Sequence, residues 1–225
     1  MTQARLVALL GHPVAASLSP QMQNAAFAAC GLDWSYVALD VEEDDFAAAV
    51  RGLPAQGFVG ANVTTPHKRT AAELAESDLE SVNTFVFEDD RIAGYSTDAA
   101  ILSGLPAERP VILGDGGAAV AFRAALPEAR VFARRGDWPP DVGDADLVVN
   151  ATSERDAVLV RLGTGQTLVD LPYPETATAL AAAEAGARVV SGLEVLVAQG
   201  AASFELWTGV SAPVDVMRRA VGLSA

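Results

Sequence analysis

The sequence is poor in the residues from which several kinds of site are built. One cysteine and two histidines among 225 residues leave no cluster at metal-ligand spacing, so we expect neither a metal site nor an internal disulfide. Its 15 basic residues against 29 acidic ones give a net charge of -14, which argues against a nucleic-acid partner. No apolar run reaches the roughly 18 residues of a membrane span. With no signal-peptide pattern at the N-terminus, we expect a soluble, cytoplasmic protein.

Lysine is the scarcest charged residue. Lys68, in the stretch NVTTPHK at 62–68, is the only one, and arginine fills every other basic position. Arginine stays protonated at ordinary pH, whereas a lysine in a partly desolvated pocket can exchange a proton with a substrate. The alternative is a solvated surface lysine without a function. The residues around Lys68 are needed to distinguish a catalytic lysine from a surface one.

The order of apolar segments predicts an α/β fold. Strand-like runs alternate with helical ones, which is typical of a mostly parallel sheet with helical crossovers. Ser19 and Thr65 each precede a proline, as helix N-caps often do, and Gly31 is expected to end the first helix. Lys68 is therefore predicted in the first turn of a helix that follows a strand. Open α/β folds bind ligands at this edge of the sheet.

A second series of strands and helices follows a predicted hairpin. Residues 82–95 are expected to form two antiparallel strands with a turn at Asp89 and Asp90, and a new alternation begins at residue 110. Two helical patterns close the sequence. We therefore expect two lobes, with the final helices able to pack back on the first.

A glycine-rich turn in the second series suits the pyrophosphate of a dinucleotide. Gly114, Gly116 and Gly117 follow an apolar strand and precede a helix, whose N-terminus offers free N–H groups. The next strand leads to Arg134 and Arg135, about 20 residues past the first glycine, where an acidic residue would suit NAD and an arginine suits the 2′-phosphate of NADP. The glycines alone could form a turn without a ligand. Together with the arginines they predict NADP.

Neutral hydrogen-bond donors are expected near the lysine. Two serines precede the first helix and could donate to a carboxylate, and an asparagine and a threonine alternate along one strand. A small polyhydroxylated acid would match this set, whereas the histidines lack the placed partner that a Ser-His-Asp triad needs. Ordinary capping and loop roles are the alternative for each residue taken singly. The set consists of Ser17, Ser19, Asn62, Thr64, Lys68, Asn83 and Asp98.

Six blocks, in this order, resemble the shikimate dehydrogenase family: GHPVAASLSP, GANVTTPHK, VNTFVF with GYSTD, LGDGGAA, DLVVNATS and GLEVLVAQGAASFELWTG. The resemblance implies a substrate-binding lobe over residues 1–98, completed by 199–225, and a Rossmann-type lobe over 99–198 that binds NADP. Enzymes of this family are oxidoreductases that reduce 3-dehydroshikimate to shikimate in the pathway to aromatic amino acids. The resemblance allows a monomer or a homodimer.

Carried over position by position, the resemblance assigns roles to single residues. Lys68 and Asp98 become the catalytic pair. Substrate contacts, or support for them, fall to Ser17, Ser19, Asn62, Thr64, Asn83, Tyr173 and Gln199. Cofactor contacts fall to Gly114, Gly116, Gly117, Ala118, Arg134, Arg135, Thr152 and Gly192.

Departures from the family pattern fall mostly in the cofactor lobe. Val120 replaces an arginine that is frequent in the family, NATSERDA lacks the usual Gly-Met, and a helix between the ARR and DLVVN segments is missing. Two other functions therefore stay open. One is a paralogue that acts on quinate or another cyclic hydroxy acid, or that uses NAD. The other is a non-catalytic ligand-binding relative, which would not require Lys68 together with Asp98.

Overall fold

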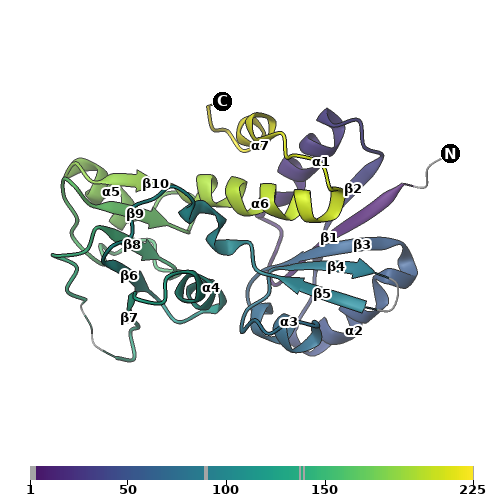
Figure 1. Ribbon diagram of the computed structural model, residues 1–225, viewed down its shortest axis with the longest axis horizontal. Helices are drawn as coiled ribbons and strands as arrows, with labels where there is room; N and C mark the ends of the chain where they lie inside the picture. Colours follow the sequence, from purple (N-terminus) through teal and green to yellow (C-terminus); the bar gives the residue numbers. More distant parts are fainter. Residues whose placement is uncertain (1–3, 89–90, 137, 139, 225) are drawn as a thin grey trace. The chain divides into compact units, whose positions relative to one another are not determined.

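The computed structural model describes residues 4–88, 91–136, 138 and 140–224. The chain divides into two compact units, one of Met1–Thr97 with Val197–Ala225 and the other of Asp98–Leu196. Each unit contains one five-stranded sheet flanked by helices (Figure 1). The predicted α/β fold class is confirmed.

The first sheet has the strand order β2-β1-β3-β4-β5. Its β1 runs parallel to β2 and β3, whereas β4 is antiparallel to β3 and β5. The predicted hairpin is present as β4 and β5, and its expected turn at 89–90 lies outside the described residues. The strands are β1 (Arg5–Gly11), β2 (Trp34–Asp40), β3 (Phe58–Val63), β4 (Thr84–Glu88) and β5 (Arg91–Tyr95).

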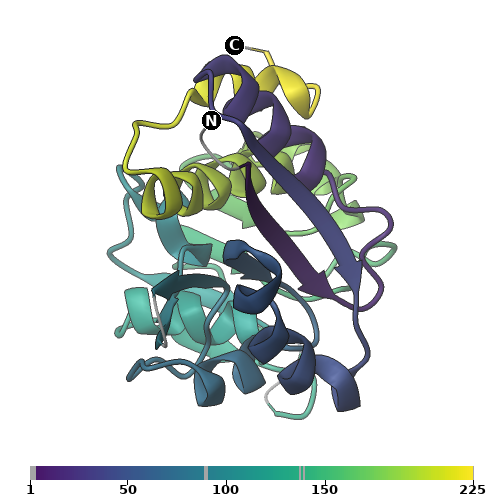
Figure 2. The ribbon, with the colours of Figure 1, turned by 90° about the vertical axis from the view of Figure 1, so that its right-hand side faces the viewer.

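Helices of the first unit come from both ends of the chain. The long α6 (Gly192–Thr208) starts in the second unit and belongs to the first from Val197 onward. Figures 1 and 2 show α1 and α7 side by side. The remaining helices are α1 (Ser19–Ala29), α2 (Phe46–Gly52), α3 (Lys68–Leu74), α7 (Val214–Ala220) and the 3-10 turns Glu43–Asp45 and Pro54–Gln56.

Both helix starts predicted from a cap residue before proline are wrong. The N-cap of α1 is Leu18 and that of α3 is His67, and neither makes a side-chain capping bond. In α1 the N–H of Ser19 is taken up by the Ser17 side chain instead. Before α3, a turn closed by the His67 N–H and the Thr64 carbonyl delays the helix to Lys68. The prediction of Lys68 in the first helical turn is correct.

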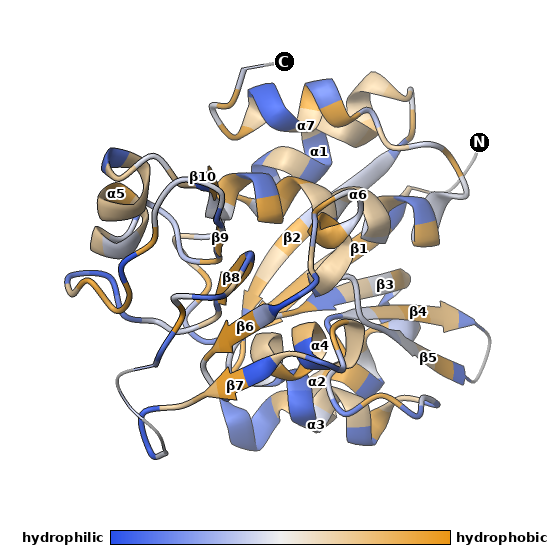
Figure 3. Cartoon of the chain, turned by 60° about the vertical axis from the view of Figure 1, so that its left-hand side comes forward, coloured by the Kyte–Doolittle hydropathy of each residue, from blue (hydrophilic) through white to orange (hydrophobic). Residues whose placement is uncertain are grey.

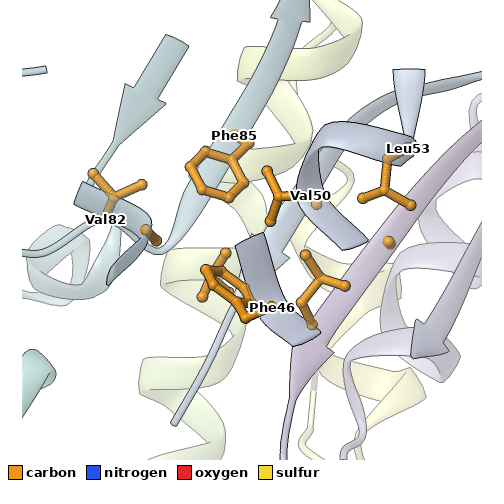
Figure 4. Close-up of a cluster of buried hydrophobic side chains, with 10 residues drawn as sticks. Phe46, Val50, Leu53, Val82 and Phe85 are labelled. Atoms are coloured by element: carbon orange, nitrogen blue, oxygen red, sulfur yellow. The ribbon is translucent and has the colours of Figure 1, made fainter. Parts of the chain in front are cut away.

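The two faces of the first sheet have different partners. On one face, residues of β1, β3 and β4 pack against α2, where Phe46, Val50 and Phe85 are fully buried (Figure 4). On the other face lies α6. A Cβ at Gly60 would lie 2.4 Å from Nε1 of Trp207, so this glycine admits the indole, which donates to the Phe85 carbonyl at 2.9 Å.

The second sheet is parallel throughout, in the order β10-β9-β8-β6-β7. Its central strands β6, β8 and β9 are buried along their whole length, and Figure 3 shows β6 as apolar. The elements are β6 (Pro110–Leu113), β7 (Arg130–Phe132), β8 (Leu147–Asn150), β9 (Thr167–Asp170), β10 (Arg188–Val190), α4 (Gly117–Ala125), α5 (Ala177–Glu184) and the 3-10 helix Asp98–Leu102.

The connection from β7 to β8 contains no helix in its described residues. Gln166 holds this connection in place. Its Nε2 donates to the carbonyls of Val142 at 2.9 Å and Ala145 at 2.8 Å, and its Oε1 accepts the Gly163 N–H at 3.0 Å. Val142 and Ala145 are buried against the sheet, so the loop covers part of the sheet face that a crossover helix would otherwise cover.

Candidate functional site

The two serines predicted to bind a carboxylate lie in the segment between β1 and α1. Asp40, the last residue of β2, holds this segment: its Oδ1 lies 2.5 Å from His12 Nδ1 and its Oδ2 accepts the Val14 N–H at 3.1 Å. Ser17 is half-buried and its Oγ accepts the Ser19 N–H at 3.2 Å, while Ser19 is buried. The structure therefore brings the two serines together at the carboxyl end of β1.

The contact between His12 and Asp40 shifts both acid–base equilibria. The hydrogen bond to Asp40 raises the pKa of the His12 ring above its ordinary value. The hydrogen bonds from His12 and from the Val14 N–H lower the pKa of the Asp40 carboxyl. Both side chains are 48% exposed, so the pair orders the loop without being removed from water.

Asn62 is the centre of a buried polar cluster on the α6 face of the first sheet. Its Oδ1 accepts the Tyr36 hydroxyl at 2.8 Å. Its Nδ2 lies within 3.1 Å of the Asn83 carbonyl and 3.0 Å of the hydroxyls of Thr84 and Ser203. An amide nitrogen has only two hydrogens, so these three acceptors share it. Both ends of the Asn62 amide are therefore engaged by the protein.

Asn83 extends the cluster to Thr97. Its Oδ1 accepts the backbone N–H of Thr97 at 2.8 Å, and its Nδ2 donates to the Thr97 hydroxyl at 2.9 Å. The same nitrogen lies 3.5 Å from Oε1 of Gln199. The structure thus joins three of the predicted substrate residues, Asn62, Asn83 and Gln199, and fixes the residue that precedes Asp98.

Lys68 is the first residue of α3 and is half-buried. Its carbonyl accepts the N–H of Val82 at 3.0 Å, so its backbone is tied to the residue before Asn83. Asp98 is buried at the start of the second unit. Thr64, just past the end of β3, donates its N–H to the Leu10 carbonyl at 2.8 Å. The pairing of Lys68 with Asp98 stays a prediction.

The glycine turn of the second unit has the form that a pyrophosphate needs. Gly114 has φ +117° and a Cβ there would lie 2.9 Å from the Ala151 carbonyl oxygen, so only glycine fits. Gly116 is exposed and caps α4 without a side-chain bond, which leaves the first N–H groups of the helix to a ligand or to water. Gly117 and Ala118 form the first turn of α4. The residues present therefore fit a dinucleotide.

A chain of hydrogen bonds positions Thr152 after β8. Asn150 Nδ2 donates to Asp170 Oδ1 at 2.7 Å, and burial raises the pKa of that carboxyl. Asn150 Oδ1 accepts the Thr152 hydroxyl at 2.7 Å, and Thr152 Oγ1 in turn accepts the Glu154 N–H at 3.3 Å. Glu154 then forms an ion pair with Arg134. Arg134 and Arg135 are both exposed.

Two predicted residues remain in the second unit. A Cβ at Gly192 would lie 2.4 Å from the Pro172 carbonyl oxygen, so α6 can start here only at glycine. The helix start is stabilised by Ser191 and Glu194, whose side chain accepts the Ser191 N–H at 2.9 Å. Tyr173 follows β9, and its carbonyl accepts from Arg155 at 3.1 Å.

Sequence reasoning missed several residues that hold the predicted ones. Thr97 and Ser203 complete the cluster around Asn83, Asp40 holds the serine loop, and Glu154 binds Arg134. Thr97 and Glu154 lie next to the motif residues Asp98 and Ser153, but nothing in the sequence shows which side chains they meet. No group of three potential metal ligands occurs among the described residues, nor any helix apolar and long enough to cross a membrane.

Comparison with known proteins identifies the family. Residues 9–84 match the model of the shikimate dehydrogenase substrate binding domain, and residues 192–221 match that of the shikimate 5′-dehydrogenase C-terminal domain. A protein of Moorella thermoacetica named shikimate dehydrogenase (NADP+) is 42% identical over 98% of this chain and 95% of its own length. One of the same name from Methanopyrus kandleri is 38% identical over 97% of this chain and 95% of its own.

Solved structures agree with the sequence comparisons. Shikimate dehydrogenase from Aquifex aeolicus is similar with a TM-score of 0.88 at 29% identity, covering 99% of both chains. The Thermus thermophilus enzyme, solved in complex with NADP(H) and shikimate, has a TM-score of 0.83 at 30% identity and covers 97% of this chain and 98% of its own. The family predicted from the six sequence blocks is thereby confirmed, and this chain belongs to the shikimate dehydrogenases.

Proposed function

We propose that this chain catalyses the reversible, NADP-dependent reduction of 3-dehydroshikimate to shikimate. The observation that carries the proposal is the polar cluster that joins Asn62, Asn83 and Gln199 and also fixes Thr97, the residue before Asp98. Because the protein itself engages both ends of the Asn62 amide, the cluster supports the proposal by fixing the segments that carry Asn83 and Gln199 for a ligand rich in hydroxyl groups. Relatives named shikimate dehydrogenase (NADP+) share 38–42% of their residues with it.

Substrate binding falls to the first unit in this proposal. Ser17 and Ser19 donate to the carboxylate of the substrate from the loop that Asp40 orders. Asn62, Thr64, Asn83 and Gln199 bind the ring hydroxyls or hold the groups that do so, and Tyr173 of the second unit lies near the substrate. Because Asn62 is engaged at both ends, we assign it mainly a supporting role.

Lys68 and Asp98 perform the proton chemistry. The Lys68 ammonium donates a proton to the developing alkoxide at C3 of the substrate, or stabilises its charge, and receives a proton back when the reaction runs in reverse. Asp98 accepts a hydrogen bond from the same hydroxyl and holds the lysine. An arginine at position 68 would keep the charge but could not transfer the proton at ordinary pH.

Cofactor binding falls to the second unit. Gly114, Gly116, Gly117 and Ala118 receive the pyrophosphate at the start of α4, Arg134 and Arg135 the 2′-phosphate, and Thr152 and Gly192 line the rest. The chemistry that NADPH supplies when bound is a hydride, delivered to the carbonyl carbon at C3. We further propose a cytoplasmic monomer or homodimer.

The test is the absorbance of the reduced nicotinamide after mixing the purified chain with shikimate and NADP, and then with NAD. An increase in this absorbance with shikimate and NADP supports the proposal. A higher kcat/KM for quinate would indicate the paralogue instead. Calorimetric binding of shikimate without any turnover or cofactor binding would indicate a non-catalytic relative and would refute the proposal.

A further inference from the structure

Arg134, which the proposed function assigns to the 2′-phosphate, already has an anionic partner in this chain. Nη2 of Arg134 forms an ion pair with Oε2 of Glu154, and the Glu154 side chain is only 24% exposed. This contact is the largest cause of the lowered pKa of the Glu154 carboxyl. Glu154 is therefore an anion at the place where a second anion is expected to bind.

The ion pair lies at the carboxyl ends of the strands of the second sheet, where the glycine turn also lies. β6 is flanked by β7 on one side and β8 on the other. At their carboxyl ends the Gly114 N–H donates to the Phe132 carbonyl at 2.8 Å and the Ala151 N–H donates to the Leu113 carbonyl at 2.9 Å. Arg134 follows β7 and Glu154 follows β8, so the pair connects the two loops that flank the glycine turn.

Glu154 is held in place independently of Arg134. Its Oε1 accepts the N–H groups of Arg155, Asp156 and Ala157 at 3.1–3.3 Å, and its own N–H donates to Thr152. The three bonds to the carboxylate use Oε1, whereas Arg134 contacts Oε2. The carboxylate is thus fixed by its own loop, and a nucleotide that arrives at Arg134 cannot easily move it away.

We propose that Glu154 sets the cofactor preference of this chain. Its carboxylate holds the Arg134 guanidinium and repels a second anion, so it reduces the advantage of a nucleotide with a 2′-phosphate over one with a free 2′-hydroxyl. A 2′-phosphate has to share or displace the Arg134–Glu154 contact, whereas a hydroxyl can leave it intact. This inference rests on the proposed function of the second unit, because it requires the nucleotide to bind at the glycine turn.

The test is calorimetric titration of the full chain with NADP+ and with NAD+, which differ only in the 2′-phosphate. Glu154→Gln removes the charge but keeps a side-chain oxygen for the three backbone N–H groups, so the loop should persist. Asp144→Asn is the matched control: Asp144 pairs with Arg130 at 2.5 Å at the opposite end of β7. This substitution also removes one negative charge from an ion pair with an arginine, but at the end of β7 away from the glycine turn.

We expect Glu154→Gln to tighten NADP+ binding roughly three- to tenfold, the size of a partly exposed charge interaction with a phosphate, and to change NAD+ binding less than about twofold. Asp144→Asn should leave the ratio of the two dissociation constants unchanged. In the Arg134→Gln background, the gain from Glu154→Gln should fall below about twofold, because the guanidinium that it releases is gone.

An unchanged ratio in Glu154→Gln with both nucleotides still bound would overturn the inference and leave the proposed function standing. The inference also fails if the gain persists in the Arg134→Gln background or appears equally in Asp144→Asn, since the effect would then be one of net charge. Failure of every variant and of the parent chain to bind either nucleotide would refute the cofactor site itself, and the inference with it.

Discussion

Replacing Asn62 with alanine should mainly lower the free energy of unfolding of the first unit, because this side chain supports the site. Asn62 is 5% exposed, its amide oxygen accepts from Tyr36, and its two amide N–H groups serve three acceptors. Three hydrogen bonds at a time are therefore lost, at a net value of about 1 kcal/mol each. We expect the free energy of unfolding to fall by about 3 kcal/mol, a large share of the roughly 5–15 kcal/mol typical of folded domains.

Urea unfolding followed by circular dichroism measures this loss. Ser17→Ala is the comparison, because the Ser17 hydroxyl accepts a single backbone N–H in a half-buried loop, and its removal should cost about 1 kcal/mol or less. Ser17→Ala should instead raise KM for shikimate. A loss of under about 1 kcal/mol in Asn62→Ala, or one equal to that in Ser17→Ala, would contradict the supporting role that we assign to Asn62.

Three further predictions address the proton donor, the serine loop and the loop between β7 and β8. Lys68→Ala should lower kcat roughly 10²- to 10⁴-fold with little change in KM. The kcat of Lys68→Arg should be closer to that of Lys68→Ala than to that of the parent chain. A kcat equal to that of the parent chain in either variant would exclude Lys68 as the proton donor. Asp40→Asn should lower the raised pKa of His12 toward its ordinary value in an NMR titration of the ring. The His12 contribution to stability should be complete below the unfolded pKa of about 6.5 and vanish as pH rises through the folded one; an unshifted titration would contradict the pairing. Gln166→Ala should cost about 2–3 kcal/mol in urea unfolding through its three hydrogen bonds, and a cost near zero would show that the loop does not depend on them.

The sequence predicts the fold class well because buried strands and helices leave apolar segments in a recognisable order. Fully buried strands such as β6 and β8 appear as continuous apolar runs, and the glycine turn between β6 and α4 is set by a backbone conformation that few other residues adopt. Helix starts are less predictable. At α1 the proline does mark the first turn, but Ser19 is not the cap, and its own N–H is satisfied by Ser17.

The candidate site is predictable in its members but not in their contacts. Asn62, Asn83 and Gln199 can be named from motifs, yet their joining depends on α6 lying on the β3 face of the first sheet, which brings Ser203 to within 3.0 Å of Asn62. Sequence spacing cannot show that an amide separated by more than a hundred residues from a hydroxyl shares a hydrogen bond with it. For the same reason the sequence presents Arg134 as an available cation, although Glu154 binds it.

The connection from β7 to β8 covers part of one face of the second sheet with no helix among its described residues, while Val131 of β7 stays 42% exposed. A crossover helix satisfies its own backbone groups, whereas a buried loop needs partners for its carbonyls. Gln166 supplies them for Val142 and Ala145, and these two residues are only 5% and 4% exposed. One amide and two small apolar residues thus cover part of a face that a crossover helix would otherwise cover. Arg134 lies in this connection just past β7, and Glu154 lies past the carboxyl end of β8, so their ion pair joins segments on the two sides of β6. We therefore expect Gln166 to affect the stability of the second unit, and Glu154 to govern which nucleotide it prefers.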